Sequence, residues 1–565
     1  MFSRRSIHKL FVAVIAFIPF VWSSSAYDSV TISADRYKSA IQQFADRVLE
    51  SGLDRYGDQK TPLFADGLHV TTLEPATWKG PKGDTWALSN FASQQSLVRL
   101  LDGLSGLTGD ARYRTAAEEA IRYVLSNVAA PNGLLYWGGH AAWDLQEDRP
   151  VGNRGNITMH ELKGQQAYYR LMWRINPDAT RRLMETIWAG HILDWSLLDY
   201  NRHASTNENH PQPWDHEFNE TIDVPFQAVG GNLSFCNVIP TFLHTGMLLS
   251  LLDQHEKALT WTRRLIYRWQ EARDPKTGLS GGQLSYRTND RAQDALGHVH
   301  PDINEAKIVA TYHQTSRYHR LPLDQMLAGE AMLAAKGRNA EVGREFIDWA
   351  SQDLQAYATH SYDPSTGLFN AVMTDGTPIQ WQRAKEGYYN PESFAPESPD
   401  GSILWGYALA WRLTQEPAHW TMLQHLFRTM ELGALGNTDG SGRALRLDTT
   451  MDDWLTIYAL LDLYDATDDG AILQLAGRVG DNLLALQTPT GLFPRKGREW
   501  ARTGDDIPLA LLHLAAAIEG KRDMIPPPVT DRQFFHAVYY GDLEPYQKKR
   551  ADERTIDSYV YYGSD

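Results

Sequence analysis

A repeated unit of two helices and a glycine-containing loop is the feature that most restricts the fold of this 565-residue chain. Each unit has an apolar helical stretch, a short polar turn, a second helical stretch and a loop containing Gly-Leu. The polar turns are LTGDARY (107–113), LLDQHEK (251–257), AAKGRNA (334–340) and LYDATDDG (463–470). The Gly-Leu loops are PNGLLYW (131–137), DPKTGLS (274–280), DPSTGLF (363–369) and TPTGLFP (488–494). Because glycine readily adopts positive φ, these loops predict chain reversals after the second helix of each unit.

Apolar residues recur at helical spacing over long stretches, whereas long alternating strand patterns are scarce. In 178–198 they are Leu183, Met184, Ile187, Trp188, Ile192 and Trp195, and 97–107 has leucines at similar steps. The sequence therefore predicts an all-α protein. The irregular spacing of the units argues against a regular solenoid, so we expect helical hairpins that close into an (α/α) toroid. Two stacked all-α domains are the alternative.

The first residues have the character of a secretory signal. Basic residues precede the apolar run 10–22, which is followed by small residues up to Ala26. The run is short for a membrane span, so we expect residues 1–26 to be a cleaved signal peptide. The protein would then be secreted or periplasmic without stable membrane insertion; an uncleaved anchor is the alternative.

No convincing linker divides the remainder. We expect residues 27–528 to form the helical barrel and residues 529–565 to form a polar, Tyr-rich C-terminal tail or surface strap. The formal net charge of −15 argues against nucleic acid as a partner. Cys236 is the only cysteine, so an intramolecular disulfide is excluded and a buried, unreactive thiol is expected.

Two histidines, a glutamate and an arginine form the most suggestive polar set. His140 ends YWGGH (136–140), Glu161 lies in HELK (160–163), and Arg202-His203 end NRH (201–203). Imidazole and carboxylate ligands favour Mn, Fe, Co, Ni or Zn over Ca. Three protein ligands also leave positions open for a substrate. The alternative is that these side chains cap helices and satisfy loop backbones.

We expect the three ligands to lie at element ends on one rim of the ring. His140 would lie in a loop, Glu161 near the start of a helix, and His203 just after the helix predicted in 178–198. The neighbouring His160 would orient a ligand or simply pack, and Asn201 would terminate a helix.

Other polar segments have weaker signals. WDHEFNETID (214–223) is interpreted as a solvated acidic loop, with calcium binding or acid-base chemistry as the alternative. Arg287 and Arg291 would hold carboxylates in bidentate fashion at outer subsites, or belong to a salt-bridged loop. Trp78, near Trp86, would form one lip of a substrate cleft.

The intervals and neighbours of His140, Glu161, Arg202 and His203 resemble those of polysaccharide lyase family 2, the pectate and oligogalacturonate lyases. The resemblance implies an (α/α)7 barrel and a divalent transition metal, most simply Mn, Ni or Co, held by the two histidines and the glutamate. It implies that Arg202 is the Brønsted base and that Lys163 contacts the substrate. It rests on residues 140–203, and the helical repeat extends the compatibility to most of the chain.

The implied reaction is β-elimination on a uronate residue of an acidic polysaccharide, pectate or oligogalacturonate first. A base removes the C5 proton and the 4-O glycosidic bond breaks, while the metal neutralises the carboxylate. Arginine normally has a pKa above about 12, so Lys163 is the rival base.

Three other functions stay open at this point. One is an (α/α) toroid glycoside hydrolase acting on uronides, which would need two opposed carboxylates; Asp215, Glu217, Glu220 and Asp223 are available. Another is a lyase specific for a glucuronate-containing glycan. The third is a carbohydrate-binding scaffold without a metal.

Overall fold

The computed structural model describes residues 33–79, 84–152, 157–162, 164, 166–231, 233–287, 303–310, 320–380 and 394–530. The chain divides into two units, Met1–Ile32 and Ser33–Asp565, and the fold concerns the second. The predicted signal peptide and all but two residues of the predicted tail lie outside the described residues. Within the described part, no helix is both long enough and apolar enough to cross a membrane.

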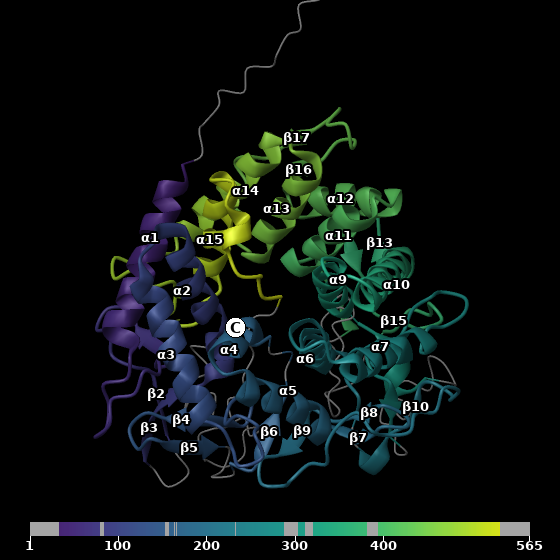
Figure 1. Ribbon diagram of the computed structural model, residues 1–565. Coiled ribbons are helices and arrows are strands. Elements are labelled where there is room, and N and C mark those ends of the chain that lie inside the picture. The colour runs from purple at the N-terminus through teal and green to yellow at the C-terminus, as the bar shows by residue number, and fades with distance from the viewer. Residues whose placement is uncertain are drawn as a thin grey trace, which may run out of the picture. The chain divides into compact units, whose positions relative to one another are not determined.

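Seven of the described helices form an inner ring (Figure 1). In chain order they are α2 (Gln95–Thr108), α4 (Tyr169–Ile175), α6 (Ile239–Leu252), α9 (Arg320–Leu333), α11 (Gly401–Thr414), α13 (Leu455–Thr467) and α15 (Ile507–Ile518). Several of these helices are buried on nearly all sides; in α15, for example, every residue from Pro508 to Ala517 is buried. A helix that is apolar all round needs neighbours on every side, and the ring provides them.

Seven further helices pack outside this ring. They are α1 (Ala34–Arg47), α3 (Ala111–Asn127), α5 (Pro177–His191), α7 (Glu256–Glu271), α10 (Arg338–His360), α12 (Pro417–Thr429) and α14 (Gly470–Leu484). Their buried residues form one stripe, as in α7. The ring closes because α15 packs against both α13 and α2, and α1 packs on α15. The predicted (α/α) toroid is therefore confirmed, with seven inner and seven outer helices among the described residues.

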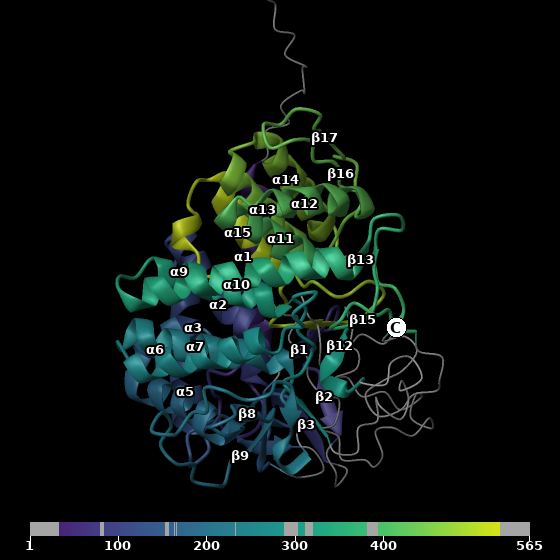
Figure 2. The ribbon, with the colours of Figure 1, turned by 90° about the vertical axis from the view of Figure 1, so that its right-hand side faces the viewer.

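The two kinds of connection between helices differ greatly in length. Each inner helix except α15, the last described α-helix, is joined to the next outer helix by a short turn, from one residue (Asn176) to four residues (334–337). The connections from outer to inner helices are 48–94, 128–168, 192–238, 272–319, 361–400, 430–454 and 485–506. Because the short turns make antiparallel hairpins, the long connections all emerge at one end of the ring. Figure 2 shows β1, β2, β3, β12 and β15 at that end.

Every described strand lies in one of these long connections. The largest sheet is antiparallel in the order β2 (Thr77–Lys79), β3 (Thr85–Ser89), β4 (Ala141–Asp144) and β5 (Arg149–Gly152). The antiparallel pairs are β1 (Gly67–His69) with β18 (Trp500–Arg502), β6 (Met159–Glu161) with β9 (His203–Ser205), β7 (Ile192–Asp194) with β8 (Asp199–Tyr200), β12 (Ile308–Val309) with β15 (Val372–Met373), β13 (Tyr362–Asp363) with β14 (Leu368–Phe369), and β16 (Gly433–Ala434) with β17 (Ala444–Leu445). The pair β10 (Phe226–Gln227) and β11 (Ser285–Tyr286) is parallel.

The glycines of the four Gly-Leu loops have the backbone conformation expected of them. Gly133, Gly278, Gly367 and Gly491 have φ of 102°, 76°, 77° and 94°, and each follows an outer helix. Residues with a Cβ atom rarely adopt such φ angles. The repeat therefore marks the points where the chain leaves an outer helix and enters a long connection.

Two local predictions are corrected. The helix predicted in 178–198 is α5 and ends at His191, because the chain then enters the β7–β8 pair. Glu161 is not at the start of a helix but ends strand β6. In both places strand pairing replaces helical hydrogen bonds: β7 pairs with β8, which follows it directly, and β6 pairs with the more distant β9.

The first residues of the predicted tail lie inside the ring. Val529 and Thr530 are fully buried. The Thr530 hydroxyl donates to Asp324 of α9 at 2.8 Å, and its N–H donates to Gln166, just before α4, at 3.3 Å. Thr530 therefore links α9 to the residues just before α4 and does not lie on the surface.

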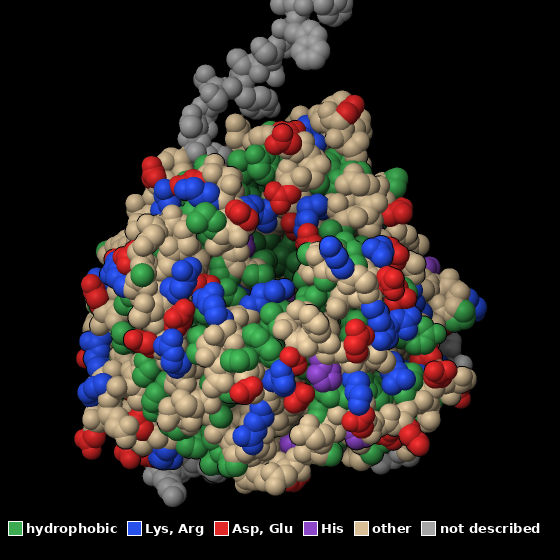
Figure 3. Space-filling view, in the orientation of Figure 1, with side chains coloured by type: hydrophobic (Ala, Val, Ile, Leu, Met, Phe, Trp, Pro, Cys, Tyr) green, Lys and Arg blue, Asp and Glu red, His purple; other side chains and the backbone are tan. Residues whose placement is uncertain are grey.

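On the face with the short turns, the described residues form no extended patch of one charge. Figure 3 shows acidic and basic side chains interspersed over it, with a hollow at the centre of the ring where hydrophobic side chains are visible.

Replacing Gly278 by alanine tests the glycine loops. Its φ of 76° is strained for alanine, although the added Cβ would meet only the Ala356 side chain at 3.5 Å. We expect the free energy of unfolding, measured by urea denaturation, to fall by about 1–2 kcal/mol. The control is Gly470→Ala at the start of α14, where φ is not positive and space is open. Equal stabilities of the two variants would contradict the argument.

Candidate metal centre

His140, Glu161 and His203 come together from three separate segments at the strand-bearing end of the ring. Glu161 of β6 lies directly opposite His203 of β9. Gly138 forms a parallel bridge to Glu161, which brings His140 to the same place. Two of the segments belong to the connection 128–168 and the third to 192–238, so neighbouring hairpins of the ring build the cluster. The prediction that they converge on one rim agrees with this arrangement.

The donor atoms have the spacing of ligands around one ion. The two Nε2 atoms of His140 and His203 are 3.3 Å apart, and they lie 3.5 Å and 3.4 Å from the Glu161 carboxylate oxygens. With bonds of about 2.1 Å, neighbouring ligands in a tetrahedral or octahedral shell lie about 3.0–3.4 Å apart. One donor atom from each residue lies within 4.8 Å of the others. The three residues therefore fit a divalent transition ion in both chemistry and spacing.

Exposure differs across the cluster in a way that favours substrate access from one side. The Glu161 side chain is fully buried, whereas His140 and His203 are 12% and 27% exposed. The carboxylate thus forms the base of the cluster and the imidazoles its accessible edge.

Arg202 lies beside the same carboxylate. Its Nε is 3.3 Å from Glu161 Oε1 and 3.3 Å from His203 Nε2, and its side chain is 16% exposed. The guanidinium carbon lies 5.7 Å from the centre of the Phe235 ring. Phe235 is itself fixed, because its carbonyl accepts the Tyr200 hydroxyl at 2.9 Å. The Arg202 side chain is therefore held at the accessible edge of the cluster.

A buried asparagine fixes the strand that leads to His140. The Asn90 amide donates to the Gly138 carbonyl at 2.8 Å, and its oxygen accepts the Gly138 N–H at 3.0 Å. Asn90 is 1% exposed, and its own N–H donates to Asp66 at 2.7 Å. Gly138 has φ of 92°, which a side chain with a Cβ would disfavour. The position of His140 is therefore set by its neighbours.

Behind the cluster lies a line of buried aromatic and imidazole groups. Trp137 Nε1 donates to His160 Nε2 at 2.7 Å, His160 Nδ1 is 2.8 Å from His191 Nε2, and His191 Nδ1 is 2.8 Å from the Asn201 carbonyl. Burial lowers the pKa of His160 to about 3. Burial, with His160 beside it, also places the pKa of His191 well below its usual value. Both imidazoles are therefore neutral at neutral pH.

His160 does not point into the cluster, although it precedes Glu161. Successive residues of a strand point to opposite faces, so Glu161 faces the cluster and His160 faces the interior. His160 is a buried residue that hydrogen-bonds to Trp137 and His191.

Of the predicted substrate-binding residues, two lie outside the described residues: Lys163 and Arg291. Arg287 is described and pairs with the buried Glu305, its Nε at 3.1 Å. Trp78 lies in β2, opposite Trp86 of β3. That sheet includes β4, which begins directly after His140. Trp78 therefore lies in the same four-stranded sheet as the strand that follows His140.

The acidic segment 214–223 is largely exposed. Asp215 forms an ion pair with Lys257, and His216 stacks on Trp195 with ring centres 4.5 Å apart. The interpretation as a solvated acidic loop agrees with this placement. Cys236 is buried, and burial raises the pKa of its thiol to about 12, so it stays protonated as expected.

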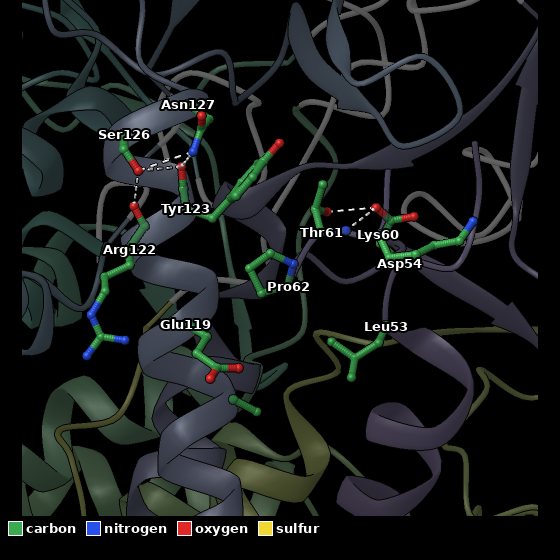
Figure 4. Close-up of a pocket in the computed structure, with 11 residues that line it drawn as sticks. Leu53, Asp54, Lys60, Thr61, Pro62, Glu119, Arg122, Tyr123, Ser126 and Asn127 are labelled. Atoms are coloured by element: carbon green, nitrogen blue, oxygen red, sulfur yellow. Dashed lines mark hydrogen bonds between the residues drawn. The ribbon is translucent and has the colours of Figure 1, made fainter. Parts of the chain in front are cut away.

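A cavity of about 630 Å³ between α3 and residues 53–62 contains none of the predicted site residues (Figure 4). The polar groups from residues 53–62 bond within their own loop. Asp54 accepts the Thr61 hydroxyl at 2.7 Å, and the Lys60 ammonium donates to the Arg55 and Gly57 carbonyls at 2.7 Å each. The cavity lining includes none of the three residues grouped at ligand spacing, so the cluster is the better candidate site.

Sequence reasoning did not find Asn90, Trp137, His191 or Phe235. Each contacts the site through a residue distant in sequence: Gly138 for Asn90, His160 for Trp137 and His191, and Arg202 for Phe235. No motif spacing marks such partners. The sequence offers only a weak indication of such residues: a polar residue next to apolar ones, such as His191 at the end of α5.

Comparisons with known proteins identify relatives over most of the chain. The family model described as periplasmic pectate lyase matches residues 61–538. A pectate disaccharide-lyase of Dickeya dadantii (strain 3937) is 24% identical over 531 residues, covering 89% of this chain and 93% of that protein.

Solved structures with some likeness have low sequence identity to this chain. The alpha-1,2-mannosidase from Trichoderma reesei has a TM-score of 0.47 and 12% identity, covering 82% of this chain and 86% of that chain. The GH76 alpha-mannanase of Bacteroides thetaiotaomicron has a TM-score of 0.42 and 10% identity, covering 87% and 98%.

Replacing Asn90 by alanine tests the support of the His140 strand. The change removes the side-chain partners of both the Gly138 N–H and its carbonyl in a buried place. We expect the free energy of unfolding to fall by about 2–4 kcal/mol, measured by urea denaturation. The exposed Asn127→Ala is the control and should change stability by no more than about 0.5 kcal/mol. A loss at Asn90 as small as the control's would contradict the assignment.

Proposed function

This chain belongs to the periplasmic pectate lyase family, and we propose that it is an exported, metal-dependent lyase that cleaves a uronate-containing polysaccharide by β-elimination. The chain is a polysaccharide lyase by its family and by its relative in Dickeya dadantii. Pectate or oligogalacturonate is the proposed substrate, since that relative is named a pectate disaccharide-lyase. The observation that carries metal dependence is the cluster of His140, Glu161 and His203 at ligand spacing.

His140, Glu161 and His203 would hold the ion, with Mn, Ni or Co the first to test. When bound, such an ion supplies Lewis acidity that neutralises a uronate carboxylate and lowers the barrier to proton loss from the adjacent carbon. The protein contributes a buried carboxylate beneath and two imidazoles at the open edge. This arrangement leaves the accessible side of the cluster to the substrate.

We assign Arg202 as the base that removes the C5 proton. It adjoins His203 in sequence and lies 3.3 Å from the same Glu161 carboxylate, so a sugar whose carboxylate lies at the cluster would present its C5 near the guanidinium. The unprotonated side chain of Arg202 takes the C5 proton, the C5–H electron pair forms the C4=C5 double bond, and the C4–O bond breaks with its electron pair on oxygen. The departing glycosidic oxygen takes a proton from water. Lys163 is the rival base.

Secretion is proposed from the N-terminal segment 1–26 and from the family's periplasmic description. The N-terminal sequence of the mature protein, recovered from the periplasm or medium, tests it directly.

Lyase activity and metal dependence are tested with a panel of polyuronates. We expect unsaturated products, seen by ultraviolet absorbance, to form fastest on polygalacturonate, to disappear after chelation and to return with added Mn, Ni or Co. His203→Ala should lose bound metal, measured by elemental analysis, and at least about 100-fold in kcat/KM, with its helical circular dichroism unchanged. His216→Ala, outside the cluster, is the matched control.

Two results would contradict this assignment. Reducing sugar without ultraviolet absorbance would mean hydrolysis instead of elimination. Full activity of the chelated enzyme, or of His203→Ala, would mean that the reaction does not depend on a metal at this cluster.

The choice of base is tested by comparing Arg202→Gln with Lys163→Gln. We expect Arg202→Gln to lower kcat by about 10²–10⁴-fold while metal binding persists, because a general base acts on the chemical step. Lys163→Gln should mainly raise KM, because it would remove a substrate contact. The reverse pattern, with kcat lost at Lys163 and KM raised at Arg202, would make lysine the base.

A further inference from the structure

We propose that Trp137, His160, His191 and Asn201, linked as one buried hydrogen-bonded chain, are the positioning residues that hold the metal ligands and Arg202 at their working spacing. We call these four hydrogen-bonded residues the histidine chain. The inference rests on the proposed function, because it names what orients that site. None of the four residues belongs to the proposed catalytic or metal-binding set.

The direction of every hydrogen bond in the histidine chain follows from its first member. An indole N–H can only donate, so His160 Nε2, 2.7 Å from Trp137 Nε1, must accept. A neutral imidazole has one N–H, so that of His160 is on Nδ1 and donates to His191 Nε2 at 2.8 Å. His191 then carries its hydrogen on Nδ1 and donates to the Asn201 carbonyl at 2.8 Å. The Trp137 N–H thus determines the tautomers of both His160 and His191, and the series of hydrogen bonds ends at the Asn201 carbonyl.

Each end and the middle of the histidine chain adjoin a segment that carries a functional side chain. Trp137 lies three residues before His140, and His160 directly precedes Glu161. Asn201 directly precedes Arg202 and His203. The two histidines and Trp137 are fully buried, so water cannot replace a lost partner. A change at one end is therefore transmitted to the other segments.

Four hydrogen bonds hold the segment 201–203 in place. The carbonyl of Asn201 accepts from His191 Nδ1, and its N–H donates to the His191 carbonyl at 2.9 Å. Its side-chain oxygen accepts the His203 N–H at 3.1 Å, and the Arg202 carbonyl accepts the Leu162 N–H at 2.8 Å. The His191 imidazole is the contact that joins this segment to the interior. Without it, the turn that aims Arg202 and His203 loses its buried anchor.

The first test reads the tautomers of the metal-free protein by nitrogen NMR of its imidazoles. We expect His160 and His191 both to carry hydrogen on Nδ1. Trp137→Phe keeps the aromatic packing on Phe91 but removes the indole donor. That change should move the hydrogen of His160 to Nε2 in part of the population and shift the His191 signals as well. Unchanged His191 signals, or Nε2–H in the wild-type protein, would overturn the inference.

The second test measures metal affinity with Mn²⁺ or Ni²⁺ by titration calorimetry. Trp137→Phe and His191→Leu should each weaken metal binding about 10–100-fold, as loss of outer-shell support generally does. His191→Gln should restore most of the affinity, because an amide can accept and donate like the imidazole it replaces. The matched control is Trp188→Phe, which removes a buried indole hydrogen bond to Thr245 at 3.0 Å outside the site. It should leave the metal affinity unchanged.

The two proposals can fail separately. If tautomers and metal affinity respond as expected but no polyuronate is cleaved, the proposed function fails and the histidine chain stands. If wild-type protein is an active lyase and Trp137→Phe and His191→Leu bind metal as tightly as wild type, the function stands and the positioning role is wrong.

Discussion

The pairing register of β6 and β9 is the constraint on which the site depends. Glu161 lies directly opposite His203 in this pair, and His160 lies opposite Ala204. A shift by one residue would turn Glu161 into the interior and His160 out to the cluster, because side chains alternate between faces. In that shifted register the Glu161 carboxylate would be buried away from any cation, and His160 would lose its buried hydrogen-bond partners. Both changes would cost free energy of folding. The histidine chain on one face and the ligand set on the other therefore favour the same register.

The helical ring explains why such a site can be built from short strands. Its short turns all lie at one end, so the long connections meet at the other, and neighbouring connections supply the two halves of the cluster. Strands of two to five residues would be unstable alone. Here each lies on a rigid ring of paired helices, which provides the precision that a functional site on loops otherwise lacks.

The sequence predicted the parts of the fold that depend on local chemistry. Helical periodicity and the Gly-Leu loops gave the toroid, and Gly133 or Gly278 has the positive φ that the pattern required. The convergence of His140, Glu161 and His203 was also predicted, but their elements were not: Glu161 was expected on a helix and lies in a strand. Three-residue strands leave too short a pattern to recognise, and their partners are about forty residues away. The supporting residues Asn90 and His191 were missed for the same reason, because their function depends on contacts and not on spacing.

The central claim is that His140, Glu161 and His203 bind one metal ion. A crystal of the protein soaked in Mn²⁺ and measured at the manganese absorption edge tests it most directly. The account predicts one anomalous peak about 2.0–2.3 Å from His140 Nε2, His203 Nε2 and a Glu161 oxygen. A fully soaked crystal with no peak there, or with its strongest peak at other residues, would contradict it.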